Sequence, residues 1–243
     1  AEKARIRPGD RVLEIGCGWG SFALLAAREY GARVTGITLS TEQAARARER
    51  VSREGLEDRV EIRLVDYRDL PAEGRTYDRV VSIEMLEAVG EEFLPGYFEV
   101  VDRLLSPDGI AVIQSITVPD DRYARYRRRP DFIQKHVFPG SHCPSVGAIV
   151  SAVSARSRLL VHHLEDVGAH YAETLRRWRE AFLANLPRVR QLGYDERFTR
   201  LWDFYLAYCE GGFAARHIGD VQVVLTRSGN RTLGPVPGYR GEA

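Results

Sequence analysis

A buried strand that runs straight into a glycine-rich turn is the feature that most constrains the fold of this chain. The strand Val12–Ile15 is apolar apart from one acid, and Gly16, Gly18 and Gly20 follow it at alternate positions. Glycine tolerates the left-handed backbone of a tight turn and lets a ligand approach the main chain closely. A helix that starts after such a turn presents free N–H groups. The segment therefore predicts the first strand, turn and helix of an α/β sheet, with a ligand at the turn.

Apolar runs alternate with helical patterns along the first half of the chain, which is typical of a parallel sheet covered by helices on both faces. Ser40 followed by Gln43 predicts a capping box at the start of a helix, and Pro107–Gly109 predicts a turn before the fifth strand. The expected strands are Arg11–Ile15, Arg33–Ile37, Val60–Val65, Tyr77–Ile83 and Ile110–Ile116, and the expected helices are Ser21–Tyr30, Ser40–Glu54 and Glu91–Leu105.

The second half of the chain departs from this alternation after Thr117. We expect a substrate-side insertion over residues 118–158, in which Pro119–Ser145 has no clear period. The remaining elements are expected as a helix at Val146–Ser154, a strand at Leu159–Val167, long helices from Ala172 to Leu192 and from Asp195 to Arg216, and a strand at Val221–Thr226. The prediction is one domain over residues 1–227 with a seven-stranded, mostly parallel sheet. A disordered tail rich in Gly and Pro is expected over 228–243.

Composition argues against several classes of protein. The net charge is +1, so no overall field favours nucleic acid. No run of about 18 apolar residues predicts a membrane span, and no signal peptide is recognised. Cys17, Cys143 and Cys209 are scattered and form no metal-ligand spacing, so neither a metal site nor a disulfide framework is expected. A cytoplasmic location fits this cysteine usage.

The spacing of the turn glycines distinguishes between cofactors. A dinucleotide-binding fold needs GxGxxG with a pyrophosphate on the helix N-terminus, whereas this chain has GxGxG behind Glu14. A carboxylate at that position would repel a pyrophosphate but can accept a hydrogen bond from an amino-acid ammonium group. The pattern therefore favours S-adenosylmethionine and a methyltransferase. The alternative is an ordinary tight turn between strand and helix.

The ends of the next strands supply the other candidate cofactor ligands. The segment Gly36–Ser40 has no acid for the ribose hydroxyls, which leaves its hydroxyl side chains and Gln43 for that role. Asp66 can accept from the adenine amino group and Tyr67 can pack on the base, although a solvated turn pair is the alternative. The candidate cofactor-binding residues are Glu14, Gly16, Gly18, Gly20, Thr38, Leu39, Ser40, Gln43, Asp66, Tyr67 and Ser82.

A series of further segments carries a family resemblance from about Pro8 to Thr226. These segments are Leu13–Gly20, Gly36–Ser40, Asp66–Leu70, Glu84–Gly90, Phe132–Lys135, Phe138–Gly140, Pro144–Ser145, His170–Ala172 and Tyr208–Phe213. In this order they resemble the cyclopropane-fatty-acyl-phospholipid synthases, a family that includes mycolic acid cyclopropane synthases and related fatty-acid methyltransferases. The first segment occurs in many methyltransferases, whereas the later set is much more specific. The resemblance implies a class I methyltransferase, Rossmann-like fold with an α-helical insertion after the fifth strand.

The resemblance also implies a reaction. The π electrons of an alkene in an acyl chain attack the sulfonium methyl group, which gives a carbocation. In the synthases a bound bicarbonate is thought to take a proton from the new methyl group and close a cyclopropane ring, and loss of a different proton gives a methylene branch. The protein then has to align the reactants and exclude water from the cation.

The family's bicarbonate ligands imply four catalytic positions in this chain. Glu87 matches the motif glutamate, although a carboxylate at a helix start is common. Tyr171 matches a tyrosine that donates through its hydroxyl, with a core aromatic residue as the alternative. Ile116 matches a position that contributes its backbone amide. Gln114 stands where many bacterial members have a titratable histidine. The family's cysteine ligand precedes the first strand, and Cys17 in the glycine turn is not its substitute.

Five arginines within residues 122–129 have two interpretations. They can attract phosphate headgroups or an anionic membrane surface, or they can form a solvated helix face balanced by nearby aspartates. The implied partners are an unsaturated phospholipid or fatty-acyl substrate, a peripheral membrane contact, a homo-oligomer, and a reductase if the product is methyl-branched. Two alternatives remain, a methyltransferase for a soluble small molecule and an inactive S-adenosylmethionine-binding domain. A long apolar tunnel would favour the lipid.

Overall fold

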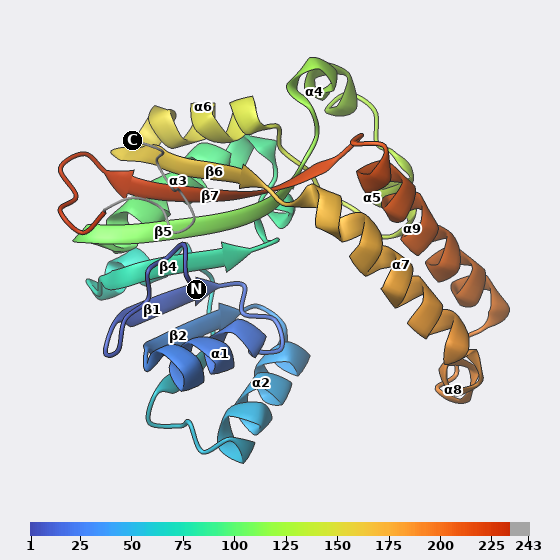
Figure 1. The fold of residues 1–243 in the computed structure, drawn as a ribbon, viewed down its shortest axis with the longest axis horizontal. Helices are drawn as coiled ribbons and strands as arrows, with labels where there is room; N and C mark the ends of the chain where they lie inside the picture. The colour runs from blue at the N-terminus through green and yellow to red at the C-terminus, as the bar shows by residue number, and fades with distance from the viewer. Residues whose placement is uncertain (234–243) are drawn as a thin grey trace, which may run out of the picture.

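The computed structural model describes residues 1–233, which form a seven-stranded sheet in the order β3-β2-β1-β4-β5-β7-β6 (Figure 1). Neighbouring strands are parallel from β3 through to β5, whereas β7 runs antiparallel to both β5 and β6. The predicted mostly parallel sheet is therefore confirmed. The strands are β1 Arg11–Ile15, β2 Arg33–Thr38, β3 Val60–Leu64, β4 Tyr77–Ile83, β5 Leu105–Thr117, β6 Leu159–Asp166 and β7 Gly219–Arg227.

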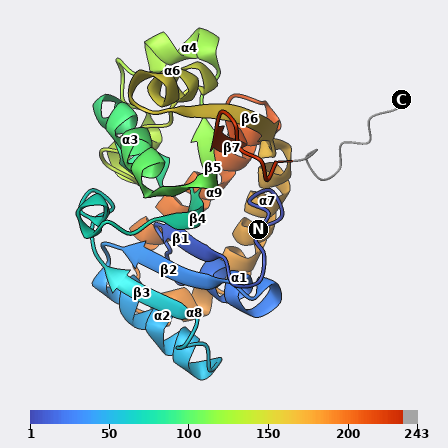
Figure 2. The same ribbon diagram turned by 90° about the vertical axis from the view of Figure 1, so that its left-hand side faces the viewer.

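Helices cover both faces of the sheet, as the alternating pattern predicts (Figure 2). One apolar cluster joins the sheet to α3 and α6, and a second joins it to α1 and α2. Within α3, Tyr97 and Phe98 are fully buried against the strands. The helices of the described residues are α1 Ser21–Tyr30, α2 Thr41–Arg53, α3 Leu94–Leu104, α4 Asp120–Tyr126, α5 Phe132–His136, α6 Val146–Arg156, α7 Gly168–Ala184, α8 Leu186–Gln191 and α9 Glu196–Ala214, with short 3-10 turns η1 Leu70–Glu73, η2 Leu86–Ala88 and η3 Glu91–Phe93.

Helices α7 and α9 form an arm that projects from the carboxyl edge of the sheet, with α8 at its far end (Figure 1). A third apolar cluster centred on Leu175, Leu206 and Phe213 holds the two long helices together. The prediction of a single helix from Ala172 to Leu192 is wrong, because the helix is interrupted at Asn185, between α7 and α8. Pro187 explains the break, since proline has no N–H and clashes with the preceding turn of a helix.

Two other local predictions need correction around β5. The helix expected over Glu91–Leu105 begins as the 3-10 turn η3, and its α-helical part ends at Leu104. Strand β5 then starts directly at Leu105 instead of after a turn at Pro107–Gly109. The pairing with β4 jumps from Leu105 to Ile110, so the expected turn residues lie in a register shift inside the strand.

The capping box expected at Ser40 forms only in part. The Ser40 hydroxyl caps α2 by accepting from the Gln43 main-chain N–H at 3.2 Å, but the Gln43 side chain bonds to Thr38 instead of returning to Ser40. A complete capping box occurs at the start of α5, where Asp131 and Gln134 bond reciprocally. Within the insertion after β5, side chains therefore cap the N-termini of α5 and α6 but not that of α4.

The first residues of the expected tail contact the sheet. The Asn230 side chain donates to the Thr226 hydroxyl at 2.7 Å and to the Asp108 carbonyl at 2.9 Å. The rest of the expected tail, 234–243, lies outside the described residues. Among residues 1–233, no helix combines the length and apolar character needed to cross a bilayer.

Candidate active site

The glycine turn after β1 needs its glycines for two physical reasons. Gly16, Gly18 and Gly20 have φ values of +80°, +51° and +78°, a region that side chains disfavour. A Cβ on Gly16 would lie 2.8 Å from Met85 Cγ, and one on Gly20 would lie 3.1 Å from Ala47 Cβ. In contrast, no atom of the described residues lies within 4 Å of a Cβ on Gly18. The turn therefore packs closely on both flanks and leaves open space above Gly18.

Glu14 places a buried carboxyl group at the base of this turn. Only 4% of the residue is exposed, and its Oε2 has no hydrogen-bond partner among residues 1–233. Burial raises the pKa of Glu14 to about 8, although the main-chain N–H of Ala23 opposes the shift. An ammonium group would supply the missing partner for Oε2. The open space above Gly18 and this unpaired carboxyl oxygen fit the amino-acid end of S-adenosylmethionine.

The candidate ribose ligands after β2 are bonded to one another. The Thr38 hydroxyl donates to Gln43 Oε1 at 2.8 Å and accepts from the Ser40 N–H at 3.1 Å. The Ser40 hydroxyl also donates to Glu42. Leu39 projects outwards and is 71% exposed. The structure thus brings all four predicted residues together at the carboxyl end of β2, where the exposed Leu39 side chain lies among polar groups.

Asp66, Tyr67 and Ser82 lie at the carboxyl ends of the neighbouring strands. The Arg68 guanidinium and main-chain N–H both donate to Asp66, which lowers the pKa of that carboxyl below its usual range. Tyr67 packs edge-on against Tyr97 with ring centroids 5.3 Å apart. Ser82 is fully buried and donates to the Ile15 carbonyl at 3.0 Å. The Ser82 hydroxyl therefore ties β4 to the base of the glycine turn.

Glu87 lies in η2, directly after β4, and its side chain points back to the end of β5. Its Oε1 accepts from the Ile116 main-chain N–H at 2.5 Å and from the Ser115 hydroxyl at 3.0 Å. Its Oε2 is buried and has no hydrogen-bond partner within the described part of the chain. Burial raises the pKa of Glu87 to about 7 despite these hydrogen bonds. The structure therefore brings together Glu87 and the Ile116 amide, two of the positions that the resemblance implies.

The other two implied positions meet at a carboxylate that the sequence analysis missed. Gln114 Nε2 donates to Glu84 Oε1 at 2.8 Å, and the Tyr171 hydroxyl donates to the same oxygen. The same Gln114 amide group also donates to Asp220 Oδ2 at 2.8 Å. Burial and the neighbouring carboxylates Glu84 and Glu87 raise the pKa of Asp220 to about 7.

These missed carboxylates left different signals in the sequence. The signal for Glu84 is its place in the matched Glu84–Gly90 segment, three residues before Glu87. The structure adds that Glu84 has a positive φ of +53°, which is unusual for a residue other than glycine. Asp220 carried no comparable signal, because it reaches the site only when β7 pairs with β5.

A chain of side chains across the sheet fixes the orientation of Gln114. Gln114 Oε1 accepts from Gln222 Nε2 at 2.9 Å, and Gln222 Oε1 accepts from Lys3 Nζ at 2.5 Å. Lys3 also forms an ion pair with Glu165. Because its carbonyl oxygen is held by Gln222, Gln114 presents its amide NH₂ group to the carboxylates.

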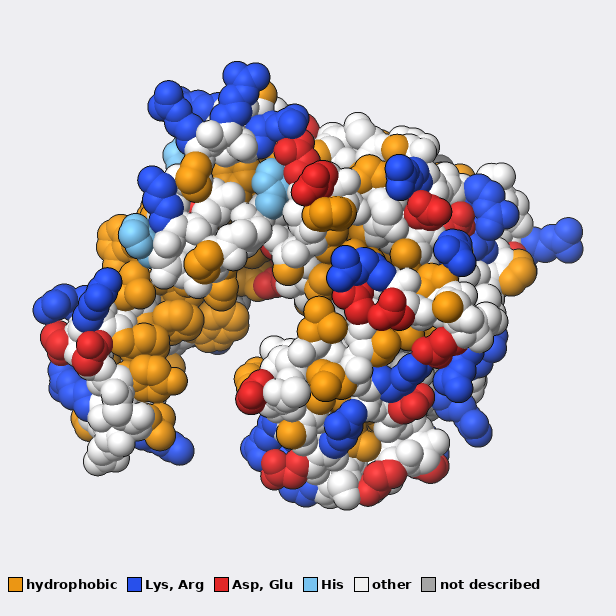
Figure 3. Space-filling view, turned by 180° about the vertical axis from the view of Figure 1, so that it is seen from behind, with side chains coloured by type: hydrophobic (Ala, Val, Ile, Leu, Met, Phe, Trp, Pro, Cys, Tyr) orange, Lys and Arg blue, Asp and Glu red, His pale blue; other side chains and the backbone are white. Residues whose placement is uncertain are grey.

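A cavity of about 890 Å³ opens beside these carboxylates. Glu84, Glu87 and Tyr171 lie on its wall, and it extends between the insertion and the α7–α9 arm. Figure 3 shows apolar side chains facing the hollow between the arm and the rest of the molecule. The apolar and aromatic residues on the cavity wall include Ile116, Val118, Ile133, Phe138, Leu175, Trp178, Tyr205, Tyr208, Phe213 and Ile218. Such a wall suits a long apolar ligand.

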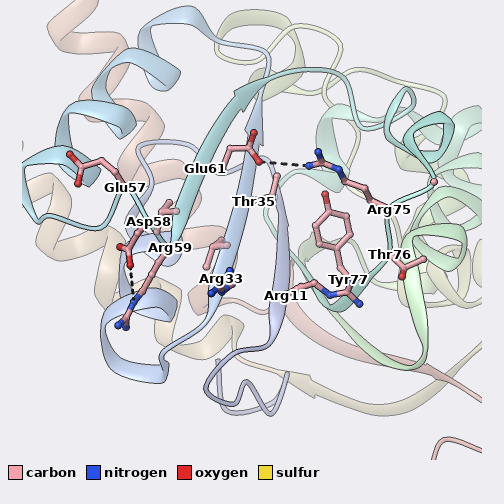
Figure 4. A pocket seen from close by; sticks show the side chains of 13 residues that line it. Arg11, Arg33, Thr35, Glu57, Asp58, Arg59, Glu61, Arg75, Thr76 and Tyr77 are labelled. Atoms are coloured by element: carbon pink, nitrogen blue, oxygen red, sulfur yellow. Dashed lines mark ion pairs between the residues drawn. The ribbon is translucent and has the colours of Figure 1, made fainter.

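A second pocket, of about 500 Å³, lies at the opposite edge of the sheet (Figure 4). Basic and acidic side chains of this pocket form ion pairs with one another: Arg59 lies 3.8 Å from Asp58, and Arg75 lies 4.0 Å from Glu61. Ligands of open parallel sheets bind at the carboxyl ends of the strands, whereas this pocket surrounds the first residues of β1 and β2. We therefore assign the candidate site to the carboxyl edge.

The strand order, the antiparallel β7 and the glycine turn after β1 define a class I methyltransferase fold. Within that class, the chain belongs to the mycolic acid cyclopropane synthetase family, whose model matches residues 1–223. The family that the sequence motifs indicated is thereby confirmed.

Two curated relatives and one solved structure illustrate the similarity. The chain is 43% identical to the tuberculostearic acid methyltransferase UfaA1 of Mycobacterium tuberculosis and 42% identical to the cyclopropane-fatty-acyl-phospholipid synthase of Escherichia coli K12, over 93% of its own length in each case. It spans about half of these relatives, 52% and 56% of their lengths. The mycolic acid cyclopropane synthase CmaA1, solved in complex with SAH and CTAB, superimposes with a TM-score of 0.82 at 28% identity, covering 93% of this chain and 80% of that one.

Proposed function

We propose that this protein transfers a methyl group from S-adenosylmethionine to a double bond in the acyl chain of a phospholipid. The observation that carries the proposal is the apolar cavity whose wall includes Glu84 and Glu87, at the carboxyl edge of the sheet. Met85, the neighbour of Glu84, packs against Gly16 of the glycine turn. The names of the two curated relatives support the same substrate class, a fatty-acyl phospholipid or a fatty acid. The SAH in the CmaA1 complex supports the cofactor.

The donor end of the site is formed by the glycine turn and Glu14. When bound, S-adenosylmethionine supplies an electrophilic methyl group on a sulfonium. The unpaired Glu14 Oε2 accepts from the ammonium group of the ligand, and Gly18 allows close approach of the main chain. We propose that Thr38, Ser40, Gln43, Asp66 and Tyr67 contact the nucleoside and that Leu39 completes the pocket, while the fully buried Ser82 supports the glycine turn from behind.

The acceptor end holds the alkene and handles a proton. The π electron pair forms the new bond to the methyl carbon, and the electrons of the old carbon–sulfur bond leave with sulfur. The resulting carbocation then loses a proton from the new methyl group. If this loss is direct, the C–H electron pair closes a cyclopropane ring. If a hydride first shifts from the methylated carbon to the cationic carbon, the same electron pair forms the double bond of a methylene branch. The apolar wall excludes water that would trap the cation. Glu87, whose pKa is about 7, is suited to accept the proton near neutral pH.

Bicarbonate fits this arrangement poorly. The Ile116 amide already donates to Glu87, and the Tyr171 hydroxyl already donates to Glu84. An added anion would also lie among three carboxyl groups of the chain, Glu84, Glu87 and Asp220. We therefore assign proton uptake to the protein's own carboxylates, with Tyr171 and Gln114 orienting Glu84.

A direct assay tests the substrate and the product together. The full-length protein is incubated with S-adenosylmethionine and vesicles of a mono-unsaturated phospholipid, and the acyl chains are examined by mass spectrometry. A gain of one CH₂ unit is expected, and catalytic hydrogenation then separates a methylene branch from a cyclopropane. Conversion of the methylene to a methyl branch would require a reductase. Unchanged acyl chains, with methylation of a soluble acceptor instead, would refute the lipid substrate.

Glu87→Gln tests the acceptor end. Because glutamine cannot take up the proton, we expect turnover to fall by about 10²- to 10⁴-fold, while S-adenosylmethionine binds with unchanged affinity in calorimetry. Glu92→Gln, an exposed neighbour in η3, is the matched control and should turn over as wild type does. Wild-type turnover in the Glu87 variant would remove this residue from the mechanism.

A further inference from the structure

One face of α4 and the turn that follows it lies on the cavity wall. Arg122, Arg125, Tyr126 and Arg129 all line the cavity, and their spacing of three, four and seven residues is that of a single helical face. The neighbouring Arg128 is exposed and does not line the cavity. The arginine cluster is therefore divided, with three of its members directed to the site.

Among the described residues, these three arginines have no acidic partner. Arg127, in the same turn, pairs with Glu91 at 3.0 Å, whereas in the part of the chain that the structure describes no ion pair involves Arg122, Arg125 or Arg129.

Of the three nearby aspartates, two accept hydrogen bonds from main-chain N–H groups, and the third, Asp121, is exposed and forms no ion pair with these arginines among the described residues. Asp120 accepts from the Gly147 N–H at 3.0 Å. Asp131, which also lines the cavity, caps α5 by accepting from the Gln134 N–H at 2.9 Å. None of these aspartates therefore forms an ion pair with the three arginines in the part of the chain that the structure describes.

We propose that Arg122, Arg125 and Arg129 bind the phosphodiester of the same lipid whose acyl chain fills the cavity. The guanidinium group matches phosphate oxygens with paired N–H donors. Figure 3 shows basic side chains gathered at the end of the molecule that carries α4. This inference rests on the proposed function and adds a headgroup subsite that requires a phosphate.

The position of the arginines favours a lipid phosphate over an acidic protein. Their side chains share a wall with Ile133 and Phe138, so that a ligand held there continues into apolar space. A phospholipid carries its phosphodiester and its acyl chains on one glycerol, so the arginines and the apolar wall can hold both ends of the same molecule. Anchoring the phosphate at the rim also fixes how deep a chain reaches, and so which carbons lie beside Glu87.

Binding of a monomeric lipid tests the subsite without chemistry and without a membrane surface. Short-chain phosphatidylcholine, below its micelle concentration, is titrated into the full-length protein in a calorimeter, with diacylglycerol of the same chains as the phosphate-free ligand. The variant Arg122→Ala/Arg125→Ala/Arg129→Ala should bind the phospholipid roughly tenfold or more weakly and the diacylglycerol as wild type does. Its affinity for S-adenosylmethionine should not change.

A control variant removes three positive charges from the surface outside the cavity. Arg53→Ala/Arg103→Ala/Arg128→Ala replaces three exposed arginines outside the cavity wall and should bind the phospholipid normally. Equal losses for both lipids, or wild-type phospholipid binding in the cavity variant, would overturn the proposal.

An acidic acyl carrier is the competing partner. If the cavity variant lost turnover only with an acyl chain on such a carrier, the arginines would serve that protein instead, and the headgroup subsite would be refuted. If phospholipid bound through these arginines but was never methylated, the proposed function would fail while the subsite stood.

Discussion

The donor end and the acceptor end of the site both place a buried carboxyl group with one unpaired oxygen at the same edge of the sheet, but they do so by different means. At the donor end, Glu14 is the fourth residue of β1, and glycines occupy the positions of positive φ in the turn that follows. At the acceptor end, Glu87 is held by the end of β5, and a non-glycine residue, Glu84, takes the positive φ. The first end is local in sequence, whereas the second depends on contacts between distant elements.

The largest expected effect on cofactor binding concerns the donor end. Burial raises the pKa of Glu14 to about 8, so the carboxyl is protonated at neutral pH before the cofactor binds. An ammonium group favours the ionised form, and binding at pH 7 should therefore release a proton. Affinity should rise from pH 6 to pH 7 by roughly tenfold at most. Calorimetry in buffers of different ionisation enthalpy measures the proton release.

Glu14→Gln is the control for this effect. It cannot ionise, so its affinity should not depend on pH in this range. Loss of a hydrogen bond to a charged group, about 1.5–3 kcal/mol, should weaken binding about 10- to 100-fold. A flat pH profile in the wild-type protein would mean that the cofactor's ammonium group does not contact this carboxyl.

The difference between the two ends explains what could be predicted from the sequence. The glycine turn, the strands β1 and β4, and the first helix follow from local pattern, and the structure confirms their bounds. The family motif also located Glu87. Asp220 could not be found in this way, because it joins the acceptor end only through the pairing of β7 with β5, more than a hundred residues from Gln114. Side-chain networks that close across a sheet leave no periodic signal.

The acceptor end should also be detectable in the pH dependence of stability. Glu87 has a pKa of about 7 in the folded protein and 4.5 when unfolded, so the folded state binds more protons between these values. Stability should therefore fall as pH rises, by about 2 kcal/mol between pH 5 and pH 8. Glu87→Gln removes this contribution, and its melting temperature should exceed that of wild type more at pH 8 than at pH 5.

Glu173 is the control for Glu87, because its pKa is lowered instead of raised. It is exposed on α7, and Arg176 and Arg177 lower its pKa to about 2. Its contribution to stability is lost only as pH falls towards that value, so Glu173→Gln should differ from wild type by the same amount at pH 5 and at pH 8. If the Glu87 variant behaved like this control, the carboxyl of Glu87 would be ionised throughout the range.

The smallest expected effect isolates the backbone strain at Glu84. Glu84→Ala and Glu84→Gly both remove the carboxylate and its bonds to Gln114 and Tyr171, but only glycine relieves the positive φ of +53°. The glycine variant should be more stable than the alanine variant by about 1 kcal/mol, measured by denaturant unfolding. The same pair at Glu49, within α2, should show the opposite order by a similar amount, because glycine destabilises a helix interior by about 1 kcal/mol relative to alanine. An alanine variant as stable as the glycine variant at Glu84 would mean that the acceptor end holds its carboxylate without strain.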